Sequence, residues 1–240
     1  MKKCLVIALA IASLGLAGPA NAADMPARAP AYKAPVAMAP AWNWTGFYVG
    51  VAGGGGWGST RHTNEFNNAT SGTNDSLNGG IFGGTYGYNW QLGSSFVAGF
   101  EGDISWSGIR DSFTNNNPFC GPAPCVTNLK WLGTDRARFG FVWDRFLAYA
   151  TGGIAYGSVQ ATCCGIPAIS DETRWRTGYA VGGGIEAMLA ANWSAKLEYL
   201  YVNLGEKTNY QALTIPAGEK VLVTSNIVRL GINYHFAVTP

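Results

Sequence analysis

The chain has 240 residues, and charged residues make up 12% of it, against about 25% in a typical soluble domain. Its 16 Lys and Arg nearly balance its 14 Asp and Glu, whereas glycine (33 residues) and aromatic side chains (13%) are abundant. A nearly neutral chain without a basic block excludes nucleic acid as a partner.

Residues 1–22 have the three parts of a secretory signal peptide. Lys2 and Lys3 precede a short apolar run, and Ala20–Ala22 forms a small-residue cleavage site. We expect cleavage after Ala22; a membrane anchor is the competing interpretation, but the run is short and ends in a Gly-Pro pair. Beyond it no run of 18 apolar residues occurs, so no helical span is expected there.

Residues 23–43 are rich in proline and alanine and show no hydrophobic period. Proline fixes the backbone and removes hydrogen-bond donors without offering a face to bury. We expect an extended linker in the periplasm.

Alternation with a period of two dominates from Trp44 onward and is typical of strands with one apolar face. In FVAGFEGDISW, the apolar Phe96, Phe100 and Ile104 alternate with Glu101 and Asp103. The same pattern predicts eight strands, near residues 46–57, 77–90, 95–107, 127–143, 146–158, 174–189, 193–205 and 222–236.

The connections between these strands alternate strictly between short and long. Short turns such as QLGS, DR and AAN alternate with long polar segments, at 58–76, 108–126, 159–173 and 206–221. Outer-membrane barrels have short periplasmic turns and long extracellular loops, whereas a soluble sandwich has shorter strands and no reason for this alternation. We therefore predict an all-β fold for residues 44–236. They should form an eight-stranded antiparallel up-and-down transmembrane β-barrel that is surrounded by the lipid of the outer membrane.

Aromatic residues cluster at the predicted strand ends, as in the two girdles of a membrane barrel. The inner girdle would contain Trp44, Trp90, Phe96, Trp143, Phe146, Trp193 and Phe236, and the outer one Trp57, Trp106, Trp131, Trp175 and Tyr201. The twelve steps from Trp131 to Trp143, at about 3.3 Å each and tilted by about 40°, span roughly 30 Å. This length suits a hydrocarbon layer.

Five ordered motifs resemble the small outer-membrane β-barrel proteins of alphaproteobacteria, which include major surface antigens, porin-like proteins and hemin-binding proteins. They are WTGFYVG (44–50), LGTDRARFGF (132–141), TGGIAYG (151–157), LEYLYVNLG (197–205) and VRLGINYHF (228–236). The resemblance implies an eight-stranded barrel that contributes to envelope integrity; some members bind heme or act as adhesins or antigens.

Two features depart from this pattern. Residues 237–240 (AVTP) extend the chain beyond the last aromatic residue, although Arg229, Gly231, Tyr234 and Phe236 match the signal by which the barrel-assembly machinery recognises a final strand. Asp135 falls on the lipid face together with Leu129 and Trp131. Because a lipid-facing carboxylate is costly, we expect a local bulge, a depth near an interface, or protonation.

Charged residues collect on the predicted inner face. They are Glu101, Asp103, Lys130, Arg136, Arg138, Arg174, Arg176, Glu186, Lys196, Glu198, Arg229 and His235. They could line a polar conduit or pair with one another in a filled lumen. An eight-stranded interior is just wide enough for side chains to fill, so a paired network is favoured.

Four cysteines follow the signal peptide: Cys120 and Cys125 in one long segment, Cys163 and Cys164 in another. The two segments should be neighbours, since the strands between them share a short turn. Two bridges between the segments are preferred, with a 120–125 bridge as the alternative. Zinc is disfavoured because the spacing matches no usual ligand pattern.

The sequence contains two histidines, His62 and His235. A lipid-modifying enzyme would need His62 with Ser59 or Glu65 at the outer rim, but a solvated loop histidine explains it better. Heme ligation by His62, or by Tyr and Met, remains an alternative without a specific signal. We expect no catalytic residues, metal or cofactor, and a non-enzymatic envelope protein whose extracellular loops contact host or envelope ligands; the alternative is a porin-like solute channel or heme-binding protein.

A glycine-rich run, Gly53, Gly55 and Gly58, formally matches the phosphate-binding pattern G-x-G-x-x-G. A phosphate loop needs a helix after the glycines, but STRHTNEFNNATSGTNDS has no helical period. The run is better interpreted as the first membrane strand, whose inner face is thinned to make room for long charged side chains from other strands.

Overall fold

The structure is a computed structural model, and it describes residues 42–64, 70–71, 77–113, 125–163, 172–209 and 219–236. The expected signal peptide (1–22), nearly all of the expected linker (23–43) and the C-terminal extension (237–240) lie outside the described residues.

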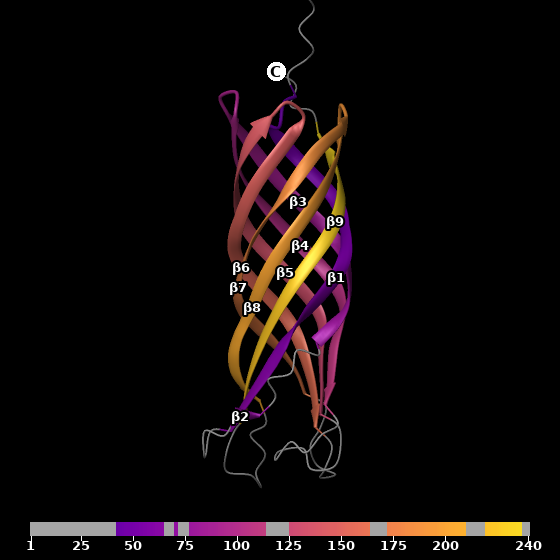
Figure 1. The fold of residues 1–240 in the computed structure, drawn as a ribbon, viewed down its shortest axis with the longest axis vertical. Coiled ribbons are helices and arrows are strands. Elements are labelled where there is room, and N and C mark those ends of the chain that lie inside the picture. Colours follow the sequence, from indigo (N-terminus) through magenta and orange to yellow (C-terminus); the bar gives the residue numbers. More distant parts are fainter. Residues whose placement is uncertain are drawn as a thin grey trace, which may run out of the picture. The chain divides into compact units, whose positions relative to one another are not determined.

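Eight long strands form one closed antiparallel barrel, as predicted (Figure 1). They are β1 (Gly46–Asn64), β3 (Leu77–Leu92), β4 (Phe96–Phe113), β5 (Cys125–Trp143), β6 (Phe146–Cys163), β7 (Glu172–Ala190), β8 (Trp193–Asn209) and β9 (Glu219–His235). Each pairs with the next along the chain, and β1 pairs with β9 to close the barrel. The two-residue β2 (Thr70–Ser71) pairs antiparallel with the end of β1. In the part of the chain that the structure describes, no helix is long and apolar enough to cross a membrane.

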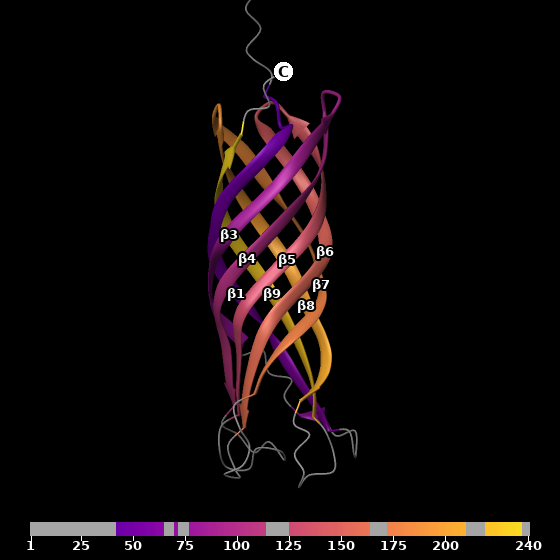
Figure 2. The same cartoon turned by 180° about the vertical axis from the view of Figure 1, so that it is seen from behind.

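All of the long strands except β3 extend farther towards the long loops than the sequence pattern indicated, and β3 extends by two residues at its other end, to Leu92. β1 reaches Asn64 rather than residue 57, and β4 reaches Phe113 rather than residue 107. The short turns, at residues 93–95, 144–145 and 191–192, lie at the opposite end, where β1 begins and β9 ends (Figure 2). At the long-loop end, strand pairing continues beyond the apolar band, where polar side chains on both faces hide the period-two pattern.

The outer face of the barrel is apolar and carries most of the predicted girdles. Large hydrophobic side chains are exposed on it, with Phe82 and Ile154 each 60% accessible. Trp57, Trp106, Trp131 and Trp175 are exposed near the long-loop end, and Trp90, Trp143 and Trp193 near the short-turn end. Such a surface is stable when lipid covers it.

Trp44 is an exception, and its assignment to the inner girdle is wrong. Its side chain is fully buried inside the short-turn end of the barrel, and its indole packs edge-on against the His235 ring at 5.9 Å. The Trp44 backbone N–H donates to the Gln91 side-chain oxygen at 2.8 Å. The segment before β1 therefore folds back into the barrel mouth, which alternation within strands does not predict.

The interior of the barrel is filled in three layers. An apolar layer at the short-turn end contains Trp44, Val97, Val142, Leu147, Tyr149 and Met188. A second at the long-loop end contains Leu77, Ile81, Ile109, Leu129, Leu132, Ala155, Val159, Ala180, Leu200, Val202, Leu204, Val223 and Ile227. Buried charged residues occupy the level between them.

The glycines of β1 make room for this filling. A Cβ atom on Gly50 would collide with the Asn233 side chain, and one on Gly56 would collide with Ile109. The inner face of the first strand is therefore thinned, as the sequence indicated. The side chains that occupy the space at these two positions, from β9 and β4, are uncharged rather than the long charged ones expected.

Candidate functional site: a charge network in the lumen

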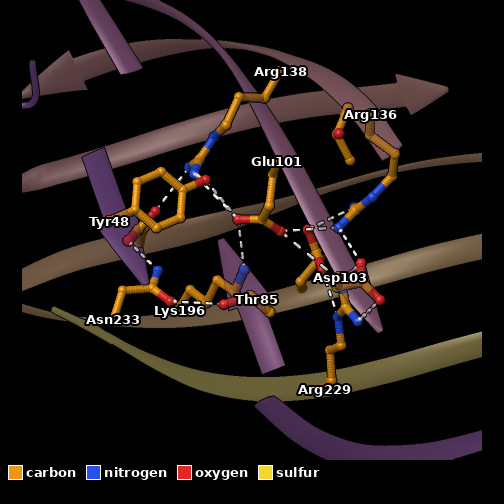
Figure 3. Close-up of polar contacts among 12 residues, drawn as sticks. Tyr48, Thr85, Glu101, Asp103, Arg136, Arg138, Lys196, Arg229 and Asn233 are labelled. Carbon is orange, nitrogen blue, oxygen red and sulfur yellow. Dashed lines mark hydrogen bonds and ion pairs between the residues drawn. The ribbon is translucent and has the colours of Figure 1, made fainter. Parts of the chain in front are cut away.

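Glu101 on β4 is the centre of the buried charge network (Figure 3). Its Oε1 lies 2.9 Å from Nη2 of Arg136, and its Oε2 lies 2.7 Å from Nζ of Lys196. The Tyr48 hydroxyl donates to the same Oε2 at 2.8 Å, and Nη1 of Arg138 lies 3.4 Å from it. Side chains from three strands other than β4, namely β1, β5 and β8, thus converge on one carboxylate.

Asp103, two residues along the same inward face, holds the next pair of cations. Arg229 donates from Nη1 and Nη2 to its two carboxylate oxygens, at 3.0 and 2.8 Å. Arg136 reaches Oδ2 at 3.0 Å, and the Thr134 hydroxyl also donates to it. The two-pronged Arg229 contact fixes geometry as well as charge.

Glu198 and Glu186 complete the network. Glu198 accepts from Nη1 of Arg136 at 2.9 Å and from Nε of Arg229 at 2.7 Å. Glu186 accepts from Nη2 of Arg138 at 2.8 Å and from the Asn233 amide at 2.7 Å. Each carboxylate therefore has at least one cationic partner, and the arginines bridge carboxylates on different strands.

The charges of this network balance. It contains four carboxylates and four cations, namely Glu101, Asp103, Glu186 and Glu198 with Arg136, Arg138, Lys196 and Arg229. Their side chains are at most 2% accessible. Removing charge from water is costly unless each ion is paired and hydrogen-bonded, and both conditions hold here.

The neutral partners of the network were not foreseen from sequence. Tyr48, Tyr149, Ser194 and Asn233 donate hydrogen bonds to its carboxylates. Ser194 has the same inward phase as Lys196 on β8, and Asn233 has the same inward phase as Arg229 on β9. Tyr48 and Tyr149 lie on strands where the sequence marks no inward charged residue. Among the other inward residues expected, Arg176 and His235 are buried, whereas Arg174 is exposed.

Leu129 and Lys130 do not follow strict alternation, and their predicted faces are wrong. Leu129 is buried in the apolar layer at the long-loop end rather than facing lipid. The register of β5 with β6 shifts between Leu129 and Trp131, which leaves Lys130 as an extra residue. A bulge exchanges the inward and outward faces for the residues on one side of it, and the alternation of apolar and polar residues does not reveal where the bulge lies.

Asp135 faces lipid as expected, and of the three explanations considered for it, a bulge at this residue is absent. It pairs in continuous register with Gly102 and Ile154, and the Tyr86 hydroxyl donates to its Oδ1 at 3.2 Å. A Cβ on Gly102 would collide with the Tyr86 ring, so that glycine makes the slot in which the ring lies. A cross-strand tyrosine thus stabilises the carboxylate.

The predicted cysteine cluster is described only in part. Cys125 and Cys163 are direct register partners on β5 and β6, whereas Cys120 and Cys164 lie outside the described residues. The two long segments are therefore neighbours where they leave the barrel.

Of the residues considered for an enzyme, the structure describes the side chain of Ser59 alone. The Ser59 hydroxyl shares a 3.1 Å hydrogen bond with Thr224, and Glu65 lies outside the described residues. His62 lies on β1 opposite Val221. Among the residues that the structure describes, no group of three or more His, Cys, Asp or Glu is placed to hold a metal ion.

The residues of the expected assembly signal alternate on β9. Arg229 and Gly231 are buried on the inner side, whereas Tyr234 and Phe236 lie outside and contact each other with ring centroids 5.2 Å apart. The Phe236 ring also packs on Phe47 at 5.7 Å.

Comparisons with known proteins agree with this architecture. A family model described as the outer membrane protein beta-barrel domain matches residues 9–236. The 31 kDa outer-membrane immunogenic protein of Brucella melitensis is 35% identical, over 96% of this chain and 99% of that protein. The 25 kDa outer-membrane immunogenic protein of Brucella abortus is 31% identical over 98% of each, and the 22 kDa outer membrane protein of Rhizobium leguminosarum is 36% identical over 74% and 71%.

Proposed function

The chain belongs to the outer-membrane β-barrel family, within the alphaproteobacterial group of small barrels, and we propose that it acts as a non-enzymatic, non-conducting structural protein of the envelope. The observation that carries this proposal is the filled lumen. Two apolar layers enclose a charge-balanced network of eight paired side chains. A water-filled pathway would instead need polar walls with open space between them.

The network also supports a mechanical role. Its ion pairs join strands distant in the barrel wall: Arg136 on β5 reaches Glu198 on β8, and Arg138 on β5 reaches Glu186 on β7. Cross-lumen ties of this kind resist flattening of a narrow barrel. A rigid barrel suits a protein that anchors surface loops and the envelope around them.

The bridging of the long segments is part of the same proposal. The direct pairing of Cys125 with Cys163 supports a disulfide between the two segments at the base of the loops. With Cys120 and Cys164 forming the second bridge, both loops would be tied together outside the membrane. Constrained loops suit contacts with host or envelope ligands.

A deletion strain tests the envelope role. We expect it to admit more of a hydrophobic fluorescent probe and to become more sensitive to detergent, and we expect the wild-type gene to restore both. Uptake of a small hydrophilic solute should stay unchanged, because the lumen does not conduct. A lower hydrophilic uptake with an intact detergent barrier would favour the porin-like alternative instead.

A further inference from the structure

A hollow of about 800 Å³ opens on the outer wall of the barrel, over β3, β4 and β5 towards the long-loop end. Its lining combines two indoles, two cations and two amides with three glycines and a serine. The six larger lining residues are Trp106, Trp131, Arg110, Lys130, Asn78 and Asn128. The volume lies in the range of small-molecule sites.

Two strand irregularities build this hollow. The register of β4 with β5 shifts between Trp106 and Ile109, and Lys130 is the extra residue of β5 against β6. The Ile109 backbone N–H donates to the Ser107 hydroxyl at 3.2 Å, which stabilises the irregular turn of β4. The Trp106 ring folds over Gly108, where a Cβ would lie 3.3 Å from it. Bulges of this kind re-aim side chains, and here they bring Lys130 to the outer wall.

The cations of the hollow differ from those of the lumen. Arg110 is exposed and lies opposite both Asn78 and Asn128 in strand register. Among the side chains that the structure describes, no carboxylate forms an ion pair with Arg110 or Lys130, whereas all four network cations in the lumen are paired. Arg110 and Lys130 therefore give the hollow a positive charge that no described carboxylate neutralises.

The depth of Arg110 suits the headgroup layer, whereas Lys130 directly precedes Trp131 and lies at the girdle itself. Arg110 follows Trp106 by four residues towards the loops, which at about 3.3 Å per residue and a tilt of about 40° places it roughly 10 Å beyond the girdle. The indoles of Trp106 and Trp131, register partners on β4 and β5, mark the boundary of the hydrocarbon. One site thus combines two indoles at the hydrocarbon boundary with one cation at that boundary and a second one beyond it.

We propose that this hollow binds the phosphorylated headgroup of an acylated glycolipid of the outer leaflet, a lipid of the lipid A class. Arg110 and Lys130 contact phosphate oxygens, because a guanidinium and an ammonium both suit phosphate. Asn78 and Asn128 face sugar hydroxyls, and the two indoles contact the sugar ring and the first part of the acyl chains. A soluble phosphate compound would not need an indole-lined edge at the membrane boundary.

Native mass spectrometry of the folded full chain in detergent tests this assignment, with bisphosphorylated lipid A as the probe. The wild type should bind it at least about tenfold more tightly than R110Q/K130Q does, since two charge-assisted contacts are lost. Arg61→Gln is the matched control: Arg61 is exposed at the same end on β1 and does not line the hollow. R61Q should stay within about twofold of wild type, on the scale of one surface charge.

Further measurements distinguish a lipid phosphate from free phosphate and separate a loss of binding from a failure to fold. Dephosphorylated lipid A should bind the wild type at least about tenfold more weakly, and inorganic phosphate at equal concentration should not displace lipid A. The charge-preserving variant R110K/K130R should keep most of the binding. The assignment would be overturned if phosphorylated and dephosphorylated lipid bound equally, or if inorganic phosphate displaced lipid A. It would also be overturned if R61Q weakened binding as much as R110Q/K130Q does, or if a folded R110Q/K130Q bound lipid A as tightly as wild type. If R110Q/K130Q does not fold, the comparison of the two lipids on the wild type decides.

Discussion

Replacing Glu101 by glutamine tests the lumen network at its centre. Glu101 accepts contacts from Tyr48, Arg136, Arg138 and Lys196, and its side chain is 2% accessible. The amide keeps the shape but leaves the buried cations with one negative charge fewer. Removing one partner of a buried ion pair costs about 3–5 kcal/mol. We therefore expect E101Q to lower the free energy of unfolding by that amount.

Urea titration of the barrel in lipid vesicles measures this loss, followed by tryptophan fluorescence and by heat-modifiable migration on electrophoresis. The double variant E101Q/K196M restores charge balance and should recover at least half of the lost free energy. Asp144→Asn is the control, because Asp144 is exposed on the β5–β6 turn with φ of 53°, a conformation that asparagine tolerates. An E101Q variant within about 0.5 kcal/mol of wild type, the scale of an ordinary surface substitution, would refute a tightly paired network.

Three other substitutions test separate parts of the structure. Tyr86→Phe removes the donor to lipid-facing Asp135 and should lower the free energy of unfolding by roughly 1.5–3 kcal/mol in the same urea titration; no change would mean that the carboxylate needs no donor. Trp44→Ala empties the short-turn end and should cost about 3–5 kcal/mol, and a smaller loss than about 1 kcal/mol would contradict its role as a plug. The mature C120S/C164S chain, refolded under oxidising conditions, should show no free thiol on titration, because Cys125 and Cys163 are register partners; two free thiols would exclude that bridge.

Much of the barrel could be predicted because its signals are local and repetitive. Alternation along β4 separated Glu101 and Asp103 from Phe100 and Ile104, and the structure places the two sets on opposite faces. The lumen network followed from the same parity, since residues of one phase share one side of a closed sheet. The pairing pattern followed from loop lengths, because short turns force neighbouring strands to be antiparallel.

The remaining features depend on breaks in that repetition or on contacts between distant strands. The bulge at Lys130 shifts the phase by one residue, so Leu129 faces inward and Lys130 reaches the outer wall. Trp44 precedes the first strand, and outside a strand the alternation of residues does not predict whether a side chain points into the barrel or towards lipid. Tyr86 lies 49 residues from Asp135, so their contact depends on strand register rather than on sequence proximity.

Single-channel recording in planar lipid bilayers tests the central claim, that the lumen is filled, most directly. The refolded wild-type chain should insert and give no conductance steps, because two apolar layers and a paired charge network occupy the interior. Reproducible conductance steps from a preparation whose barrel is intact by heat-modifiable migration would contradict the filled lumen and favour a porin-like protein.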